Sequence, residues 1–416
     1  MKLFTSIKKA FIIALVLGVF VLETTKINAQ TAYIANNGDG KVKVINTLNN
    51  SLITTIQLQF GLYGVAVSPD GTRVYITNNL SNSISIINTA TNSVIASVPT
   101  AIGPTDIIVS PDNSKVYFIV GYKMYVLDAA TNTITNTINL VNQCKGLAIT
   151  PDGTKIYAAC NNISTFSIKT ISTASNTVTN TIAISSFPYE LRVSPDGNKL
   201  YIALTDNSAL MVMSTATNTV INTIPVGNHP LNMCFNSNGS KLYVANNYDY
   251  TVSVVNTSTN SVSATIGTIG DNPSGISITP NDSKLYVTNA GRNTAVDINA
   301  LTNTATTFIY LGTAINTDPI CYGNFISTYA QPSGITDYKQ DFIHISLIPN
   351  PTTGQFAISL PTDNAEITIT NAMGQKLLSE QTNERLVNVQ LETNGLYIVY
   401  VKTKQGSTAQ KLIVNN

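Results

Sequence analysis

The sequence is short of charge. Only 11% of its 416 residues are charged, and 23 Lys and Arg nearly cancel 22 Asp and Glu, so the formal net charge is +1. Proteins that bind nucleic acid neutralise phosphates with a clear excess of Lys and Arg. We therefore expect no nucleic-acid partner. Tryptophan is absent too, but 43% of the residues are hydrophobic, enough for a substantial core.

Histidine is scarce as well. The chain has two, His229 and His344, so a metal site or a catalytic site built on several histidines is excluded. A single Ser-His-Asp site through His229 remains open. The sequence also lacks a glycine-rich phosphate loop, a CxxC pair and an EF-hand loop. We expect no metal and no cofactor.

Cysteine is limited to four residues, Cys144, Cys160, Cys234 and Cys321. Cys144 and Cys160 flank a turn centred on Asp152, so they could face each other across a hairpin. A disulfide between them and two buried free thiols fit the sequence equally well.

The N-terminal apolar run, 11–22, has only 12 residues, whereas a membrane-spanning helix needs about 20. Three lysines precede it, and the small residue Ala29 stands before a plausible cleavage point. This pattern predicts a signal peptide over 1–29, a mature chain that starts at Gln30 and no transmembrane segment in that chain. The alternative is a buried N-terminal strand.

A repeated phrase dominates the rest of the chain. SPDGTRVYITN at 68–78 returns with changes, and a second phrase of the T-x-T-N type keeps the same period. The repeated tyrosines are Tyr33, Tyr75, Tyr117, Tyr157, Tyr201, Tyr243 and Tyr286, and the final asparagines of the second phrase are Asn50, Asn92, Asn132, Asn176, Asn218, Asn260 and Asn303. Two markers in step make a chance repeat implausible.

Each unit contains four short alternating stretches separated by turns, as in 61–99. Four strands in about 40–45 residues are typical of a β-propeller blade. The mature chain enters at the second strand of a unit, and 318–322 resembles one further first strand. The sequence therefore predicts an all-β fold: a seven-bladed β-propeller over 30–330, closed by a C-terminal strand. An open solenoid would need capping repeats.

The LYVTN-type phrase, with SPDG before it and T-x-T-N after it, resembles the YVTN family of seven-bladed propeller repeats over about 31–330. Surface-layer proteins and secreted bacterial proteins carry such repeats. The resemblance is specific for the fold and does not specify a function.

The period stops after Pro332, and 331–342 is predicted to be a linker. The segment 343–416 has alternating strands with Gly and Asn turns, which predicts a small Ig-like β-sandwich. It resembles the type A C-terminal sorting domain of the type IX secretion system. The residues that carry the resemblance are Pro349, Asn350, Pro351, Gly354, Gly374, Gly395 and Tyr397.

This resemblance implies a bacterium of the Bacteroidetes type, export through the periplasm and across the outer membrane, contact with the type IX machinery, and removal of the tail after export. The expected destination is the medium or the outer-membrane surface. The alternative for 343–416 is a carbohydrate-binding or spacer sandwich.

The repeated acids of the SPDG-type turns, such as Asp70 and Asp112, are expected to be structural, because Asn replaces Asp in other units. Loops that vary on a constant scaffold are the better place for recognition, and these lie on the opposite rim, between second and third strands and before first strands. The candidate ligand-binding residues on that rim and at the starts of the first strands are Tyr63, Asp106, Lys145, Tyr189, Glu190, His229, Asn232, Tyr248, Asp249, Tyr250 and Arg292.

Two functions remain open. The first is a secreted, monomeric, non-catalytic binding or surface-structural protein, with a glycan or a peptide as its ligand. The second is a secreted lactonase- or lyase-like enzyme in which Asp106, Glu190, His229 and Arg292 form the site at the channel mouth. A structure in which Glu190 and His229 converge would favour the enzyme.

Overall fold

The computed structural model describes residues 31–162, 165–267, 269–311, 325–326, 345–360, 364–371, 375–403 and 406–415. The chain divides into two compact units, Met1–Ser333 and Gly334–Asn416. The predicted signal peptide with Ala29 and Gln30, the predicted strand at 318–322 and the predicted linker at 331–342 lie outside the described residues. No helix in the described ranges is long and apolar enough to cross a membrane.

The first unit contains one three-stranded sheet and six four-stranded sheets, each with its strands in chain order. The three-stranded sheet consists of β1 (Thr31–Asn36), β2 (Lys41–Asn46) and β3 (Ser51–Gln57). The four-stranded sheets are β4 (Leu62–Val67), β5 (Arg73–Asn78), β6 (Ser83–Asn88) and β7 (Ser93–Pro99); β8 (Pro104–Val109), β9 (Lys115–Val120), β10 (Lys123–Asp128) and β11 (Thr133–Asn139); β12 (Gln143–Ile149), β13 (Lys155–Asn162), β14 (Thr165–Ser172) and β15 (Thr177–Ile184); β16 (Pro188–Val193), β17 (Lys199–Leu204), β18 (Ala209–Ser214) and β19 (Val220–Pro225); β20 (Pro230–Phe235), β21 (Lys241–Asn246), β22 (Thr251–Asn256) and β23 (Ser261–Ile266); and β24 (Pro273–Ile278), β25 (Lys284–Asn289), β26 (Thr294–Asn299) and β27 (Thr304–Tyr310). Two short 3-10 helices, η1 (Thr205–Asn207) and η2 (Ala290–Arg292), connect second and third strands.

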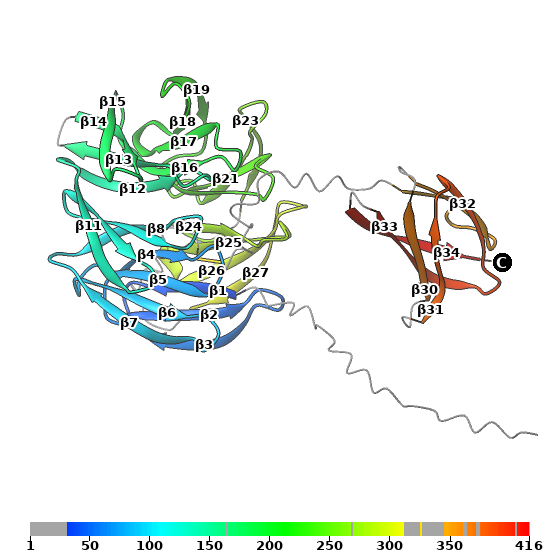
Figure 1. Cartoon of the computed structure of the whole chain (residues 1–416). Coiled ribbons are helices and arrows are strands. Elements are labelled where there is room, and N and C mark those ends of the chain that lie inside the picture. Colours follow the sequence, from blue (N-terminus) through cyan, green and yellow to red (C-terminus); the bar gives the residue numbers. More distant parts are fainter. Residues whose placement is uncertain are drawn as a thin grey trace, which may run out of the picture. The chain divides into compact units, whose positions relative to one another are not determined.

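The sheets follow one another around a ring, with β24–β27 beside β1–β3 (Figure 1). The first strands of neighbouring four-stranded sheets contact each other in the order β4, β8, β12, β16, β20 and β24. They therefore form the innermost layer, as in a β-propeller. The predicted all-β fold class, a propeller followed by a small β domain, is confirmed.

The last sheet packs against the first. Tyr286 and Ala295 of the last sheet share one buried hydrophobic cluster with Ala32 and Val44 of the first. Polar contacts follow the same seam: Asn50 Nδ2 donates to Asp297 Oδ2 at 2.8 Å. The ring is thus joined by side chains of its first and last sheets.

A short segment after β27 also contacts the first sheet. Tyr33 N donates to Phe325 O at 2.7 Å, and Ala32 forms an antiparallel bridge with Ile326. Phe325 and Ile326 are completely buried in the cluster of the first sheet. The described contact therefore lies a few residues beyond the segment that was expected to complete this sheet.

The repeated tyrosines and asparagines connect neighbouring sheets. All seven tyrosines are buried, and all seven asparagines have positive φ, a conformation that Asn tolerates better than most residues. The Tyr33 hydroxyl donates to Asn92 Oδ1 of the next sheet at 2.8 Å, and Tyr201 reaches Asn260 in the same way at 3.4 Å. One phrase therefore supplies the donor and the other the acceptor, which explains why both keep the same period.

Replacing Tyr33 by Phe removes one such bond and leaves Asn92 without its tyrosine partner. We expect the free energy of unfolding to fall by about 0.5–1.5 kcal/mol, measured by urea unfolding. Tyr122→Phe, at an exposed loop position, is the matched control and should change stability little. Equal effects of the two substitutions would contradict the role assigned to the tyrosine hydroxyl.

The acids of the SPDG-type turns bond within their own turns, as expected. Asp70 Oδ1 accepts hydrogen bonds from Ser68 Oγ at 2.6 Å and from Thr72 N at 3.0 Å. These bonds hold the pKa of Asp70 below its ordinary value in spite of partial burial. The next position has positive φ and is Gly71 in this turn, so only a residue that tolerates that conformation can end the turn.

The second unit contains two sheets, β28-β29-β32 and β31-β30-β33-β34. The strands are β28 (Ser346–Ile348), β29 (Gln355–Ser359), β30 (Ala365–Asn371), β31 (Lys376–Thr382), β32 (Leu386–Gln390), β33 (Gly395–Thr403) and β34 (Gly406–Val414). Side chains of both sheets, including Phe356 and Val399, share one hydrophobic cluster. This arrangement is a small β-sandwich.

The described motif residues of this sandwich lie in the segment between β28 and β29 and in β33. Pro349, Asn350 and Pro351 follow β28, and Gly395 begins β33. Tyr397 is buried, and its hydroxyl donates to Thr393 O at 2.7 Å. Gly354 precedes β29 with positive φ, whereas Gly374 lies outside the described residues.

Candidate functional site

A cavity of about 220 Å³ lies among the innermost strands of the propeller. Its lining residues come from β4, β8, β12 and β16 and from the SPDG turn after β4: Ala66, Val67, Pro69, Asp106, Ile107, Ile108, Val109, Leu147, Ala148, Ile149, Arg192 and Val193. Most of the wall is apolar, and Asp106 and Arg192 are its charged members. The cavity is therefore a candidate small-molecule site in the part of the chain that the structure describes.

Apart from Arg192, the polar residues around the cavity occupy one register position of the first strands. Three glycines and three polar residues occupy the corresponding positions: Gly64, Asp106, Gly146, Glu190, Asn232 and Gly275. A Cβ on Gly146 would lie 2.6 Å from Tyr189 O and 3.3 Å from Glu190 Oε2. Glycine on β12 thus leaves the room that the Glu190 side chain occupies.

Asp106 is buried on β8, and its Oδ2 accepts a hydrogen bond from Leu147 N of β12 at 2.6 Å. Burial raises the pKa of Asp106, although Arg192 and two backbone N–H groups act in the opposite direction. A buried carboxylate of this kind is costly to keep ionised, and such groups concentrate at functional sites.

Buried Glu190 and half-buried Arg192 form an ion pair on β16. Arg192 Nη1 also donates to Leu191 O at 2.8 Å, and Arg192 Nη2 donates to Asn232 Oδ1 of β20 at 3.2 Å. Burial raises the pKa of Glu190, and this effect exceeds the opposing attraction of Arg192. Asn232 is completely buried, and its Nδ2 has no acceptor among the described residues.

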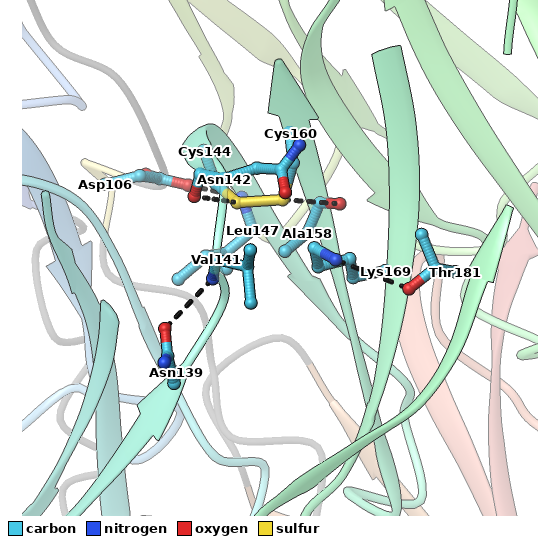
Figure 2. The surroundings of a disulfide bond; sticks show 10 residues. All are labelled: Asp106, Asn139, Val141, Asn142, Cys144, Leu147, Ala158, Cys160, Lys169 and Thr181. Carbon is cyan, nitrogen blue, oxygen red and sulfur yellow. Dashed lines mark hydrogen bonds between the residues drawn. A yellow bond between two sulfur atoms is a disulfide. The ribbon is translucent and has the colours of Figure 1, made fainter. Parts of the chain in front are cut away.

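Cys144 and Cys160 form a disulfide between β12 and β13, which resolves the two alternatives left open by the sequence. Figure 2 shows the bridge together with Asp106 and Leu147. The strands carry a register shift between Cys144 and Gly146. The disulfide therefore fixes β12 at the irregularity that precedes Leu147, the residue whose N–H contacts Asp106.

The buried carboxyls predict a pH dependence of stability. Because burial raises the pKa of Glu190 and Asp106, the folded protein binds more protons than the unfolded chain above about pH 4, and the free energy of unfolding falls as pH rises. Glu190→Gln should flatten this decline between pH 5 and pH 8, as measured by urea unfolding. Asp249→Asn, at a rim loop, is the control. An unchanged slope in Glu190→Gln would contradict the prediction.

The predicted rim residues gather in one place around the loop between β21 and β22. The His229 ring stacks on Tyr248 with centroids 4.1 Å apart, and Asp249 Oδ2 accepts a hydrogen bond from Asn228 N at 2.6 Å. Tyr248 and Tyr250 are 57% and 45% exposed. The structure thus holds an aromatic surface on this rim, while the cavity reaches the other rim at Pro69.

The remaining predicted residues are Tyr63, Lys145, Tyr189 and Arg292. Arg292 stands in η2 and forms an exposed ion pair with Asp271 at 2.6 Å. The other three, Tyr63, Lys145 and Tyr189, are half-buried and directly precede Gly64, Gly146 and Glu190 in the chain. The centroid of the Tyr189 ring lies 6.3 Å from that of Phe187. Glu190 pairs with Arg192 and His229 with Tyr248, so Glu190 and His229 do not converge.

Arg192 is the site residue that sequence reasoning missed. It stands where other first strands have Ala66, Ile108, Ala148 or Cys234. A guanidinium in place of a small or apolar side chain on an innermost strand was a signal in the sequence, and the four-strand alternation concealed it.

Comparisons with known proteins identify the C-terminal unit and the fold of the first. Residues 346–415 match the family model described as "Secretion system C-terminal sorting domain". No curated protein matches the chain.

Several solved structures share the fold. Kuenenia stuttgartiensis hydrazine synthase is 19% identical, with 68% of this chain and 93% of that chain covered and a TM-score of 0.57. A protein of unknown function from Desulfotomaculum acetoxidans is 16% identical, with 71% and 99% covered and a TM-score of 0.62. Dihydro-heme d1 dehydrogenase NirN, in complex with DHE, is 12% identical, with 88% and 76% covered and a TM-score of 0.54. At these identities the similarity concerns the fold alone.

The propeller is thus joined to a unit whose role is known from its family. A sorting domain of this kind is recognised by the type IX secretion machinery. Residues 346–415 are a secretion system C-terminal sorting domain, and the protein is directed to the cell surface or outer membrane.

Proposed function

We propose that the chain is a YVTN-type propeller that acts outside the cell as a non-catalytic binding module. In this proposal the first sheet and the six four-stranded sheets are seven blades, and the segment that contains Phe325 and Ile326 completes the first. A signal peptide ending at Ala29 starts export in a Bacteroidetes-type cell. A surface-structural role with no small ligand is the alternative within the same class.

One observation supports binding most directly. Asp106 and Arg192 come from different sheets, are charged, and line one largely apolar cavity. Burying such groups costs several kcal/mol unless their interactions compensate for it, and a pocket with a few convergent polar groups on apolar walls is the usual form of a ligand site.

The positions of Glu190 and His229 favour binding over the lactonase- or lyase-like alternative. That alternative needs a general acid or base pair at the channel mouth. Glu190 instead pairs with Arg192 inside the channel, and His229 stacks on Tyr248 at the rim. The raised pKa of Glu190 and Asp106 is the feature that would suit an acid catalyst.

The test uses the full secreted protein, purified from the medium of the producing cells. It is screened against a glycan array, a peptide library and a metabolite collection, and each ligand found is then incubated with the protein and analysed for chemical change. Binding without turnover is expected. Turnover would replace the proposal by the enzyme alternative, and the absence of any ligand would favour the surface-structural role.

Variants then locate the ligand. Asp106→Asn should weaken binding if the ligand occupies the cavity, whereas Tyr248→Ala with Tyr250→Ala should weaken it if the ligand occupies the exposed rim. The second result would retain the proposed function and move its site to the variable loops, where a glycan or peptide would contact tyrosine rings.

A further inference from the structure

The two charged groups of the cavity are opposite in sign and are not paired with each other. Asp106 belongs to β8 and Arg192 to β16, with β12 between these strands. Among the described residues, Arg192 forms its ion pair with Glu190, and Asp106 forms none. The cavity wall therefore presents a carboxylate and a guanidinium as separate groups.

Both groups keep hydrogen-bonding capacity. A carboxylate offers about four lone-pair sites, and the bonds of Asp106 come from backbone N–H groups of Leu147 and Ile107. Arg192 has five N–H groups, and its bonds use Nη1 and one N–H of Nη2. Its Nε–H and the second Nη2–H have no acceptor in the described part of the chain.

Asn232 adds an independent sign of a missing acceptor. Its Oδ1 accepts the bond from Arg192, so the side chain points to the guanidinium, and its completely buried Nδ2 lacks an acceptor among the described residues. Buried polar groups without a partner are rare and costly. A ligand oxygen in the cavity beside Arg192 would satisfy the free N–H groups of the guanidinium.

The rest of the wall limits the ligand body. Val67, Ile108, Val109, Ile149 and Val193 are among the apolar lining residues. The volume of about 220 Å³ is below the range of about 300–1,000 Å³ found for common ligand pockets. These side chains and this volume favour a small ligand with an apolar part.

We propose that this cavity binds a small zwitterion of the α-amino acid class with an apolar side chain. Asp106 accepts hydrogen bonds from the α-ammonium group, Arg192 donates to the α-carboxylate, and the aliphatic wall surrounds the side chain. The inference rests on the proposed binding function and narrows its ligand to one chemical class.

Three matched probes test the inference with the full-length secreted chain in calorimetric or NMR titrations. L-leucine carries both charged groups, 3-methylbutan-1-amine lacks the carboxylate, and 4-methylpentanoate lacks the ammonium. Leucine should bind, and each analogue should bind at least about tenfold more weakly, because each loses charge-assisted hydrogen bonds. Equal binding of leucine and either analogue, or no binding of leucine, would overturn the inference.

Variants assign the two ends of the ligand. Asp106→Asn should weaken leucine and the amine but leave 4-methylpentanoate unchanged, and Arg192→Gln should weaken leucine and 4-methylpentanoate but leave the amine unchanged. Asp206→Asn, at an exposed position in η1, is the control and should bind leucine normally. If either channel variant fails to fold, the three probes on the unaltered protein still decide the question. A glycan or peptide found by the wider screen together with a negative result for leucine would remove this inference and leave the proposed binding function intact.

Discussion

Deleting residues 343–416 should leave the protein in the periplasm. The deleted segment contains the whole region that matches the sorting-domain family, 346–415, and β28 to β34 all belong to it. Because the propeller forms a separate compact unit with its own hydrophobic clusters, we expect it to fold without the sandwich. Cell fractionation and immunoblotting in a bacterium with a type IX system measure the outcome, which should be an almost complete loss from the surface and the medium.

The controls separate failed sorting from failed folding. The truncated propeller recovered from the periplasm should resist protease and contain the Cys144–Cys160 disulfide, as in the full chain. A chain that carries only Tyr33→Phe is slightly destabilised but keeps the sandwich, and it should be exported normally. Normal secretion of the truncated chain would show that 343–416 is not needed for export.

The fold could be predicted from the sequence because its two markers form one physical contact. Tyr33 and Asn92 belong to different phrases, yet they bond to each other across neighbouring sheets. The same contact joins Tyr157 to Asn218, Tyr201 to Asn260 and Tyr286 to Asn50, and a recurring contact imposes the same period on both phrases. The segment that completes the first sheet was less predictable, since its contact at Phe325 and Ile326 occurs once and has no repeat with which to compare it.

The site could be predicted only in part. Asp106, Glu190 and Asn232 were recognisable as polar residues near the starts of first strands. Their pairing was not, because it depends on which side chain crosses to the neighbouring strand and on the space that Gly146 leaves for Glu190. The convergence of Glu190 with His229 that would have favoured the enzyme alternative is not found, since Glu190 pairs with Arg192 and His229 stacks on Tyr248 at the rim.

The disulfide illustrates the same limit. Cys144 and Cys160 were recognised as possible partners across a hairpin, but the sequence could not place them on directly opposed positions. The register of β12 and β13 does so, with Cα atoms 3.9 Å apart. Register depends on the irregularity between Cys144 and Gly146, and a single sequence gives no direct signal for such a shift.

Replacing both Phe325 and Ile326 by Ala should destabilise the propeller more than any other substitution considered above. Both side chains are completely buried among residues of the first sheet, the second sheet and the last sheet. Truncating a buried Phe costs about 3–5 kcal/mol and truncating a buried Ile about 2–5 kcal/mol. The double variant should therefore lose several kcal/mol of unfolding free energy, measured by urea unfolding. It should also aggregate, because weakening this segment uncovers the free edge of β1, and light scattering reports that change.

The control is Phe60→Ala with Leu80→Ala, which truncates two exposed side chains of similar size and should leave stability and solubility nearly unchanged. Removal of 319–329, which contains both buried residues, should give the same result more strongly. A double variant that stays monomeric and unfolds at the same urea concentration as the unaltered protein would show that the ring closes without this segment, through the direct contacts between the first and last sheets.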